Sequence, residues 1–110
     1  MGFRMTLQTA HVLRVLLDDP LGEHYGLEMS KAARLPGGTL YPILARLERE
    51  GWVTSDWEEL DEHKAGRRRR RYYRLTPDGA VWAAQALAAT EKQISPRGIP
   101  ARRPGLAGAQ

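Results

Sequence analysis

The chain of 110 residues contains no cysteine and only one phenylalanine. Without cysteine it has neither a disulfide framework nor a thiolate nucleophile or ligand, which fits a reducing compartment. No apolar stretch approaches the ~20 residues that a membrane helix needs, and the first residues lack the apolar core of a signal peptide. With 42% apolar and 27% charged residues, the sequence predicts one small globular domain with a modest core.

The sequence also lacks any arrangement of residues that points to catalysis. The histidines fall in separate expected elements, and none is spaced from another histidine or a carboxylate as metal ligands are. No serine lies in a nucleophile motif, and Gly37-Gly38 is not followed by the Lys-Ser/Thr of a phosphate loop. We therefore expect no catalytic residue, no metal site, no cofactor and no enzymatic activity.

The positive charge of the chain is concentrated in its second half. Residues 1–58 hold six basic and eight acidic residues, a net of −2, whereas residues 59–110 hold eleven and five, a net of +6. Five of those basic residues are the consecutive arginines 67–71. Phosphate binding depends on local charge density, so this run favours a nucleic-acid contact. The alternative reading is an ordinary solvated charge run.

Three helices are predicted in the first half of the chain, and a short turn joins the second to the third. Apolar residues recur at helical spacing over 6–18, with Thr6 as the N-cap. A second, shorter helix is expected over about 25–33, although Gly26 weakens it. The turn at 35–38 then leads into the third helix. This order is typical of a helix-turn-helix.

The third helix has two distinct faces. It is expected to begin between Gly37 and Thr39, which would keep Pro42 near the first turn, and to end at Gly51. Its core face comprises Leu40, Ile43, Leu44 and Leu47. The opposite face comprises small residues and arginines, namely Gly38, Pro42, Ala45 and Arg49, flanked by Tyr41 and Arg46. Small residues allow a helix to approach a groove closely, and arginine can reach phosphates or guanine edges.

A β-hairpin and a fourth helix are expected after the third helix. Strands are predicted at 52–57 and 72–75, with a polar loop over 58–66 and the arginine run at its tip, which is the form of a wing. Of the adjacent Tyr72 and Tyr73, one should face the core, because neighbouring strand residues point to opposite sides. The Thr76-Pro77-Asp78 sequence predicts the cap and first turn of the next helix.

The fourth helix is apolar on nearly all sides, since Gln85 is the only polar residue between positions 80 and 89. One small domain can cover one side of such a helix, so we expect a second copy of the chain to cover the other. The alternative is that its alanines simply favour helix formation. The predicted fold is mainly α with a small β-hairpin: a winged helix-turn-helix over 1–76, a dimerisation helix over 77–93 and a flexible basic Pro/Gly-rich tail over 94–110.

Two separated motifs resemble the PadR family of transcriptional regulators over approximately residues 6–93. The first runs Gly38-Thr39-Leu40-Tyr41-Pro42-Ile43-Leu44, followed by Leu47-Glu48 and Glu50-Gly51, and the second is Tyr72-Tyr73-Arg74-Leu75-Thr76 with Gly79. The resemblance implies a repressor that binds a palindromic double-stranded DNA operator as a homodimer, in a bacterial-type cytoplasm and associated with the nucleoid. It also implies the short subgroup with a single C-terminal helix, which forms most of the dimer interface.

The resemblance and the two faces of the helices together define the predicted sites. The predicted DNA-binding residues are Gly38, Thr39, Tyr41, Pro42, Ala45, Arg46, Arg49, Lys64, Arg67, Arg68, Arg69, Arg70 and Arg71. The predicted dimer interface is Leu7, Val12, Val15, Leu16, Val81, Trp82, Ala84, Gln85 and Ala88. Some relatives hold flat aromatic or cationic effectors with tryptophans at the dimer interface, so Trp82 is either part of a candidate effector pocket or a packing residue.

One rival interpretation of the same features remains. A winged-helix module that binds RNA or protein partners, without operator specificity, would also carry a basic wing. A protein-binding version should expose large apolar groups on the outer face of the third helix, where this chain has Gly38, Ala45 and Arg49. That composition favours DNA.

Overall fold

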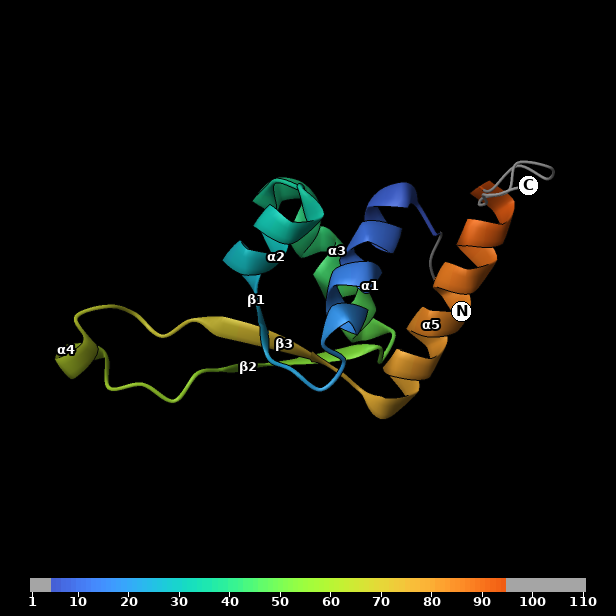
Figure 1. The fold of residues 1–110 in the computed structure, drawn as a ribbon. Coiled ribbons are helices and arrows are strands. Elements are labelled where there is room, and N and C mark those ends of the chain that lie inside the picture. The colour runs from blue at the N-terminus through green and yellow to red at the C-terminus, as the bar shows by residue number, and fades with distance from the viewer. Residues whose placement is uncertain (1–4, 95–110) are drawn as a thin grey trace.

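The computed structural model describes residues 5–94, and the predicted tail lies outside this range apart from its first residue. Figure 1 shows a helical body from which a long β-hairpin extends, with α5 at the opposite end. The elements are α1 (Leu7–Asp18), β1 (His24–Tyr25), α2 (Gly26–Ala33), α3 (Gly37–Arg49), β2 (Val53–Trp57), α4 (Glu62–Ala65), β3 (Arg71–Leu75) and α5 (Pro77–Ile94). The predicted fold class, mainly α with a small β-hairpin, is confirmed.

The sheet has one strand more than the predicted hairpin. Its order is β1-β3-β2, and both pairings are antiparallel. Strand β2 pairs with β3 from Val53 opposite Leu75 to Trp57 opposite Arg71. Strand β1 consists of two residues, His24 and Tyr25, and anchors the start of α2 to the middle strand. A strand this short carries no periodic pattern, so the sequence could not reveal it.

The predicted helix caps are confirmed. The Thr6 hydroxyl accepts from the Thr9 amide at 3.1 Å at the start of α1, and the Thr76 hydroxyl accepts from the Gly79 amide at 2.8 Å at the start of α5. At the end of α3, Gly51 has φ +81°, and the Trp52 amide donates to the Leu47 carbonyl at 2.9 Å. A glycine in this left-handed conformation stops the helix and turns the chain into β2.

The hydrophobic core lies around α1, which contacts α2, α3 and α5 of the same chain. Val12, Leu13 and Leu16 are fully buried. Helix α5 packs on α1 and contributes the buried Ala83 and Leu87 to the core. The predicted inward face of α3 is confirmed, because its four apolar residues are all buried. Tyr73 also enters the core, as expected for one of the two adjacent tyrosines.

The polar stretch predicted as a loop between the strands contains a single helical turn, α4. The Asp61 carboxylate accepts from the amides of His63 and Lys64 at 3.1 and 3.2 Å, and Gly66 ends the turn with φ +70°. The expectation of an irregular loop was therefore wrong at the tip. A four-residue helix is too short for an apolar face, so hydrophobic periodicity could not show it.

Arg34 offers a direct test of helix-end energetics. It ends α2 with φ 57° and ψ 46°, a left-handed conformation that glycine adopts without a steric cost. We expect Arg34→Gly to raise the free energy of unfolding by about 0.5–1 kcal/mol, measured by urea denaturation. Lys31→Gly is the matched control, because the same loss of a cation inside α2 should lower stability by about 1 kcal/mol. Equal effects of the two changes would contradict this reading.

Candidate nucleic-acid interface

The outer face of α3 is exposed and carries the residues predicted for it. Gly38, Pro42, Ala45 and Arg49 are exposed, Tyr41 is 48% exposed, and Thr39 and Arg46 are half-buried. The helix starts at Gly37, as predicted, so Pro42 falls in the second turn. Because proline has no backbone N–H, the Gly38 carbonyl receives no helical hydrogen bond from it. Both groups lie on the exposed face, where solvent or a ligand can satisfy the carbonyl.

Tyr41 is held at the junction of α2 and α3. A Cβ atom added at Gly26 would lie 2.1 Å from the Tyr41 hydroxyl oxygen, and one added at Gly37 would lie 3.3 Å from the ring. The Tyr41 side chain therefore packs closely against both glycines. Sequence reasoning treated Gly26 only as a weakness of α2 and missed this role, which needs the distance between two helices to be known.

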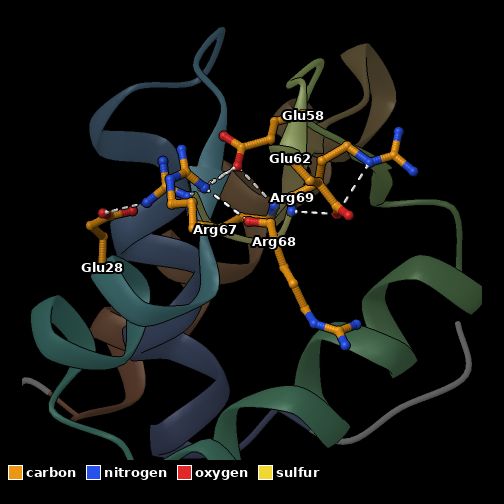
Figure 2. A network of polar contacts seen from close by, with 7 residues as sticks. Glu28, Glu58, Glu62, Arg67, Arg68 and Arg69 are labelled. Atoms are coloured by element: carbon orange, nitrogen blue, oxygen red, sulfur yellow. Dashed lines mark hydrogen bonds and ion pairs between the residues drawn. The ribbon is translucent and has the colours of Figure 1, made fainter. Parts of the chain in front are cut away.

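The arginines of the wing extend from its tip to the first residue of β3. Residues 67–71 are all exposed, and Lys64 on α4 is exposed beside them. The run was predicted as one cationic surface, but the structure divides it. Four of its five guanidinium groups are engaged by groups of the same chain, and Figure 2 shows several of these contacts.

Glu58 forms hydrogen bonds with two arginines at the tip of the wing. Its Oε1 atom accepts from the Arg67 guanidinium at 2.6 Å and from the Arg70 amide at 2.8 Å, and its own amide donates to the Arg70 carbonyl at 2.9 Å. The hydrogen bond from Arg67, followed by those from Arg70, lowers the pKa of Glu58 to about 2. The carboxylate is therefore ionised at every pH at which the protein would work.

Of the remaining paired arginines, Arg69 makes its contact within the wing, and Arg70 ties the wing to the helical body. The Arg69 guanidinium lies 3.7 Å from the Glu62 carboxylate of α4. The Arg70 guanidinium lies 4.1 Å from the centre of the Tyr25 ring and 3.5 Å from the carboxylate of Glu28 on α2. The wing is thus held against α2 as well as by its own sheet.

A second polar chain joins α3 to the base of the wing. The Ser55 hydroxyl on β2 donates to the Glu48 carboxylate of α3 at 2.8 Å and accepts from the Arg71 guanidinium at 2.7 Å. The same guanidinium lies 5.6 Å from the centre of the Trp57 ring. The two elements predicted to contact DNA therefore share one hydrogen-bonded connection, which the sequence did not reveal.

The predicted dimer surface is only partly available. Leu7, Val81 and Trp82 are 59%, 54% and 38% exposed, and Ala84, Gln85 and Ala88 are also exposed. Val15 is half-buried. Val12 and Leu16, however, are fully buried inside the chain. Because these two side chains have no exposed surface, they cannot contact a second copy, and the prediction that they belong to the dimer interface is wrong.

Trp82 packs against a second tryptophan. Its ring centre lies 5.8 Å from that of Trp52, at an interplanar angle of 49°. Trp52 is buried, so this contact fastens the first turns of α5 to the start of β2. Among the residues that the structure describes, two surface hollows of about 520 and 440 Å³ lie elsewhere, one between α1 and α2 and the other beside β1 and the wing, and neither is lined by Trp82. The structure thus gives Trp82 a packing contact, and its 38% exposure leaves a side open for further contacts.

Within residues 5–94, none of the helices is long and apolar enough to cross a membrane.

Solved structures of several bacterial proteins share this fold. The protein smu.1704 from Streptococcus mutans is 24% identical with a TM-score of 0.66, and the match covers 97% of this chain and 100% of that chain. A PadR family transcription regulator from hypervirulent Clostridium difficile is 26% identical with a TM-score of 0.58, covering 80% and 86%. Staphylococcus aureus MepR in complex with DNA is 19% identical with a TM-score of 0.62, covering 81% and 67%.

Other matched proteins are longer than this chain, which spans 59% of the length of a Lactococcus lactis ZitR variant and 62% of that of a second structure of MepR. No curated protein sequence matches the chain. A family model does match: that of the PadR-like transcriptional regulators, over residues 12–85. That span contains the helix-turn-helix, the wing and the first half of α5, so the chain belongs to the PadR-like family of transcriptional regulators.

Proposed function

We propose that the protein binds a palindromic operator as a homodimer, represses transcription there and is released by a small-molecule effector. The observation that carries DNA binding is the outer face of α3, where small residues and Arg49 are exposed next to the basic wing. A helix with this face fits a major groove, and wing cations fit the flanking phosphates. The structural likeness to MepR, which has been solved in complex with DNA, supports the same reading.

Each part of the surface has a distinct role in this proposal. Arg49 and Arg46 reach base edges or phosphates from α3, and the Tyr41 hydroxyl, fixed by its contact with Gly26, binds a phosphate. Two copies of α3 enter successive major grooves about 34–36 Å apart, which requires a two-fold dimer. The exposed apolar face of α5 supplies the surface for that dimer.

Operator binding can be tested with DNA from upstream of the protein's own gene. We expect fluorescence anisotropy at ~150 mM salt to show ~10³-fold preference over a scrambled duplex, with two chains per site. Arg49→Ala should weaken operator binding by about 1–3 kcal/mol. If Arg49 contacts a base edge, the variant should also show a smaller preference for the operator over the scrambled duplex. Arg14→Ala is the control, because Arg14 is an exposed arginine of α1, outside α3 and the wing, and should leave affinity within about twofold.

Equal, salt-sensitive binding to both duplexes would remove the operator claim. Tighter binding to RNA than to duplex DNA would instead support the alternative function, a winged-helix module that binds RNA or protein partners without operator specificity. Repression is tested by a reporter fused to the bound promoter, whose output should rise when the regulator is deleted. Release by an effector is tested by titrating planar cationic compounds while Trp82 fluorescence and operator binding are both recorded.

A further inference from the structure

We propose that Glu58 is a positioning residue for DNA binding: it orders the wing tip so that Arg68, of the five consecutive arginines, is the one presented to DNA. This inference rests on the proposed function and adds a division of labour within the wing. It also reverses the simple electrostatic expectation, because a carboxylate near a DNA surface would ordinarily weaken binding.

The first step in the argument is the way Glu58 holds Arg67. The Glu58 carboxylate lies 2.6 Å from the Arg67 guanidinium, and its side chain is only 12% exposed. The Arg67 guanidinium in turn donates to the carbonyl oxygen of Arg68 at 3.0 Å. Glu58 therefore reaches the backbone of Arg68 through one intermediate side chain.

The second step concerns the peptide bond that follows Arg68. Its carbonyl oxygen accepts from Arg67, and its N–H, which belongs to Arg69, donates to the Glu62 carboxylate at 2.8 Å. Both polar groups of one peptide unit are thus tied. The next amide, that of Arg70, donates to Glu58 itself. Because these hydrogen bonds hold the backbone, they restrict the direction in which the Arg68 side chain extends from the wing.

The third step is that Arg68 alone keeps its guanidinium available. The other four cations of the run are close to carboxylates: Arg67 to Glu58, Arg69 to Glu62, Arg70 to Glu28 and Glu58, and Arg71 to Glu48. In the described part of the chain, the Arg68 side chain has no such partner. Figure 2 shows it pointing away from the carboxylates that hold its neighbours.

Comparison of two opposing effects gives the sign of the expected change. One extra negative charge on an exposed wing is screened over about 8 Å at physiological salt, so it repels DNA weakly. A disordered arginine must instead lose side-chain and backbone freedom when it binds, and ordering it in advance removes that cost. The ordering effect is the larger, so removal of Glu58 should weaken binding.

Glu58→Ala and Glu59→Ala make a matched pair. Both remove one negative charge from adjacent positions, but Glu59 is exposed and makes no contact of this kind within residues 5–94. We expect Glu58→Ala to weaken operator binding about tenfold in fluorescence anisotropy at ~150 mM salt, and Glu59→Ala to bind as tightly as the parent or slightly more tightly. Equal affinities of the two variants would overturn the proposal.

A double-mutant cycle with Arg68→Ala tests whether Glu58 acts through that arginine. Arg68→Ala should weaken binding to all duplexes and lower the slope of log affinity against log salt by about 0.9. In the Arg68→Ala background, Glu58→Ala should then have little further effect. If Glu58→Ala still costs the full tenfold without Arg68, its role is general wing stability and the proposed positioning is wrong.

A measurement on the free protein separates this proposal from the proposed function. Amide hydrogen exchange of Arg70 should speed up at least tenfold in Glu58→Ala and stay unchanged in Glu59→Ala, because the first variant removes the carboxylate to which this amide donates. If the parent binds no DNA while this difference appears, the ordering stands and DNA binding fails. If amide exchange is unchanged in Glu58→Ala, Glu58 does not order the wing tip, whatever the result of the DNA-binding experiment.

Discussion

Replacement of Gly79 by alanine is expected to lower the free energy of unfolding by about 3 kcal/mol or more. Gly79 lies in the first turn of α5, against the junction of α3 and β2. A Cβ atom there would lie 2.0 Å from the Trp52 carbonyl oxygen and 2.8 Å from the Thr76 hydroxyl. The carbonyl cannot move away freely, because it accepts from the Thr76 amide at 3.0 Å. The added methyl group must therefore push α5 away from the body or break that contact.

Urea denaturation followed by far-UV circular dichroism measures this effect. Gly38→Ala is the matched control, since it makes the same change near the start of α3, where no atom lies within 4 Å of the added Cβ. It should raise stability by about 0.4–1 kcal/mol, because alanine favours helix and restricts the unfolded chain. A Gly79→Ala variant that unfolds at the same urea concentration as the parent would contradict the close packing at this junction.

Replacement of Val81 by glutamate is expected to separate the two copies of the proposed homodimer and to weaken operator binding at least ~10²-fold. Val81 is 54% exposed on the outer face of α5, in line with Ala84, Gln85 and Ala88. In a single chain a charge at this position meets solvent and changes stability by about 0.5 kcal/mol or less. Between two copies it would be buried without a partner, which costs far more. The two half-sites would then be bound independently.

Analytical ultracentrifugation gives the first readout. The parent should sediment as twice the 12.4 kDa chain and the variant as one chain at micromolar concentration. Leu21→Glu is the control, because Leu21 is 89% exposed in the loop before β1 and should not alter the mass. Circular dichroism separates a folded monomer from an unfolded one. A parent that sediments as one chain, or a Val81→Glu variant that remains a dimer, would remove α5 from the interface.

The features readable from the sequence were those with a local cause. The inward residues of α3 repeat at helical spacing, so their burial followed from periodicity alone. The caps at Thr6 and Thr76 depend on one side chain and the next three residues, and they too were predictable. The Tyr72-Tyr73 pair was resolved by the alternation of a strand, which places one of the two in the core.

What the sequence did not show depends on residues far apart in the chain. The arginine run looked like one free cationic surface, but its pairing with Glu28 and Glu48 requires the wing to lie beside α2 and α3. Val12 and Leu16 were expected at a dimer interface because α1 is apolar on two sides, yet both are fully buried within the fold of a single chain. The contact of Tyr41 with Gly26 likewise needs the spacing of two helices.

The junction around Trp52 also determines how motion would pass through the molecule. The end of α3, the start of β2 and the first turn of α5 meet there, joined by the Thr76 hydroxyl, which donates to the Gly51 carbonyl at 2.8 Å, and by the close approach of Gly79. These contacts restrict movement of the first turn of α5 relative to the end of α3. If two copies meet through α5, the angle between the paired helices sets the distance between the two DNA-reading helices. A compound that changed that angle by a few degrees would alter operator fit without touching a single DNA-contacting residue.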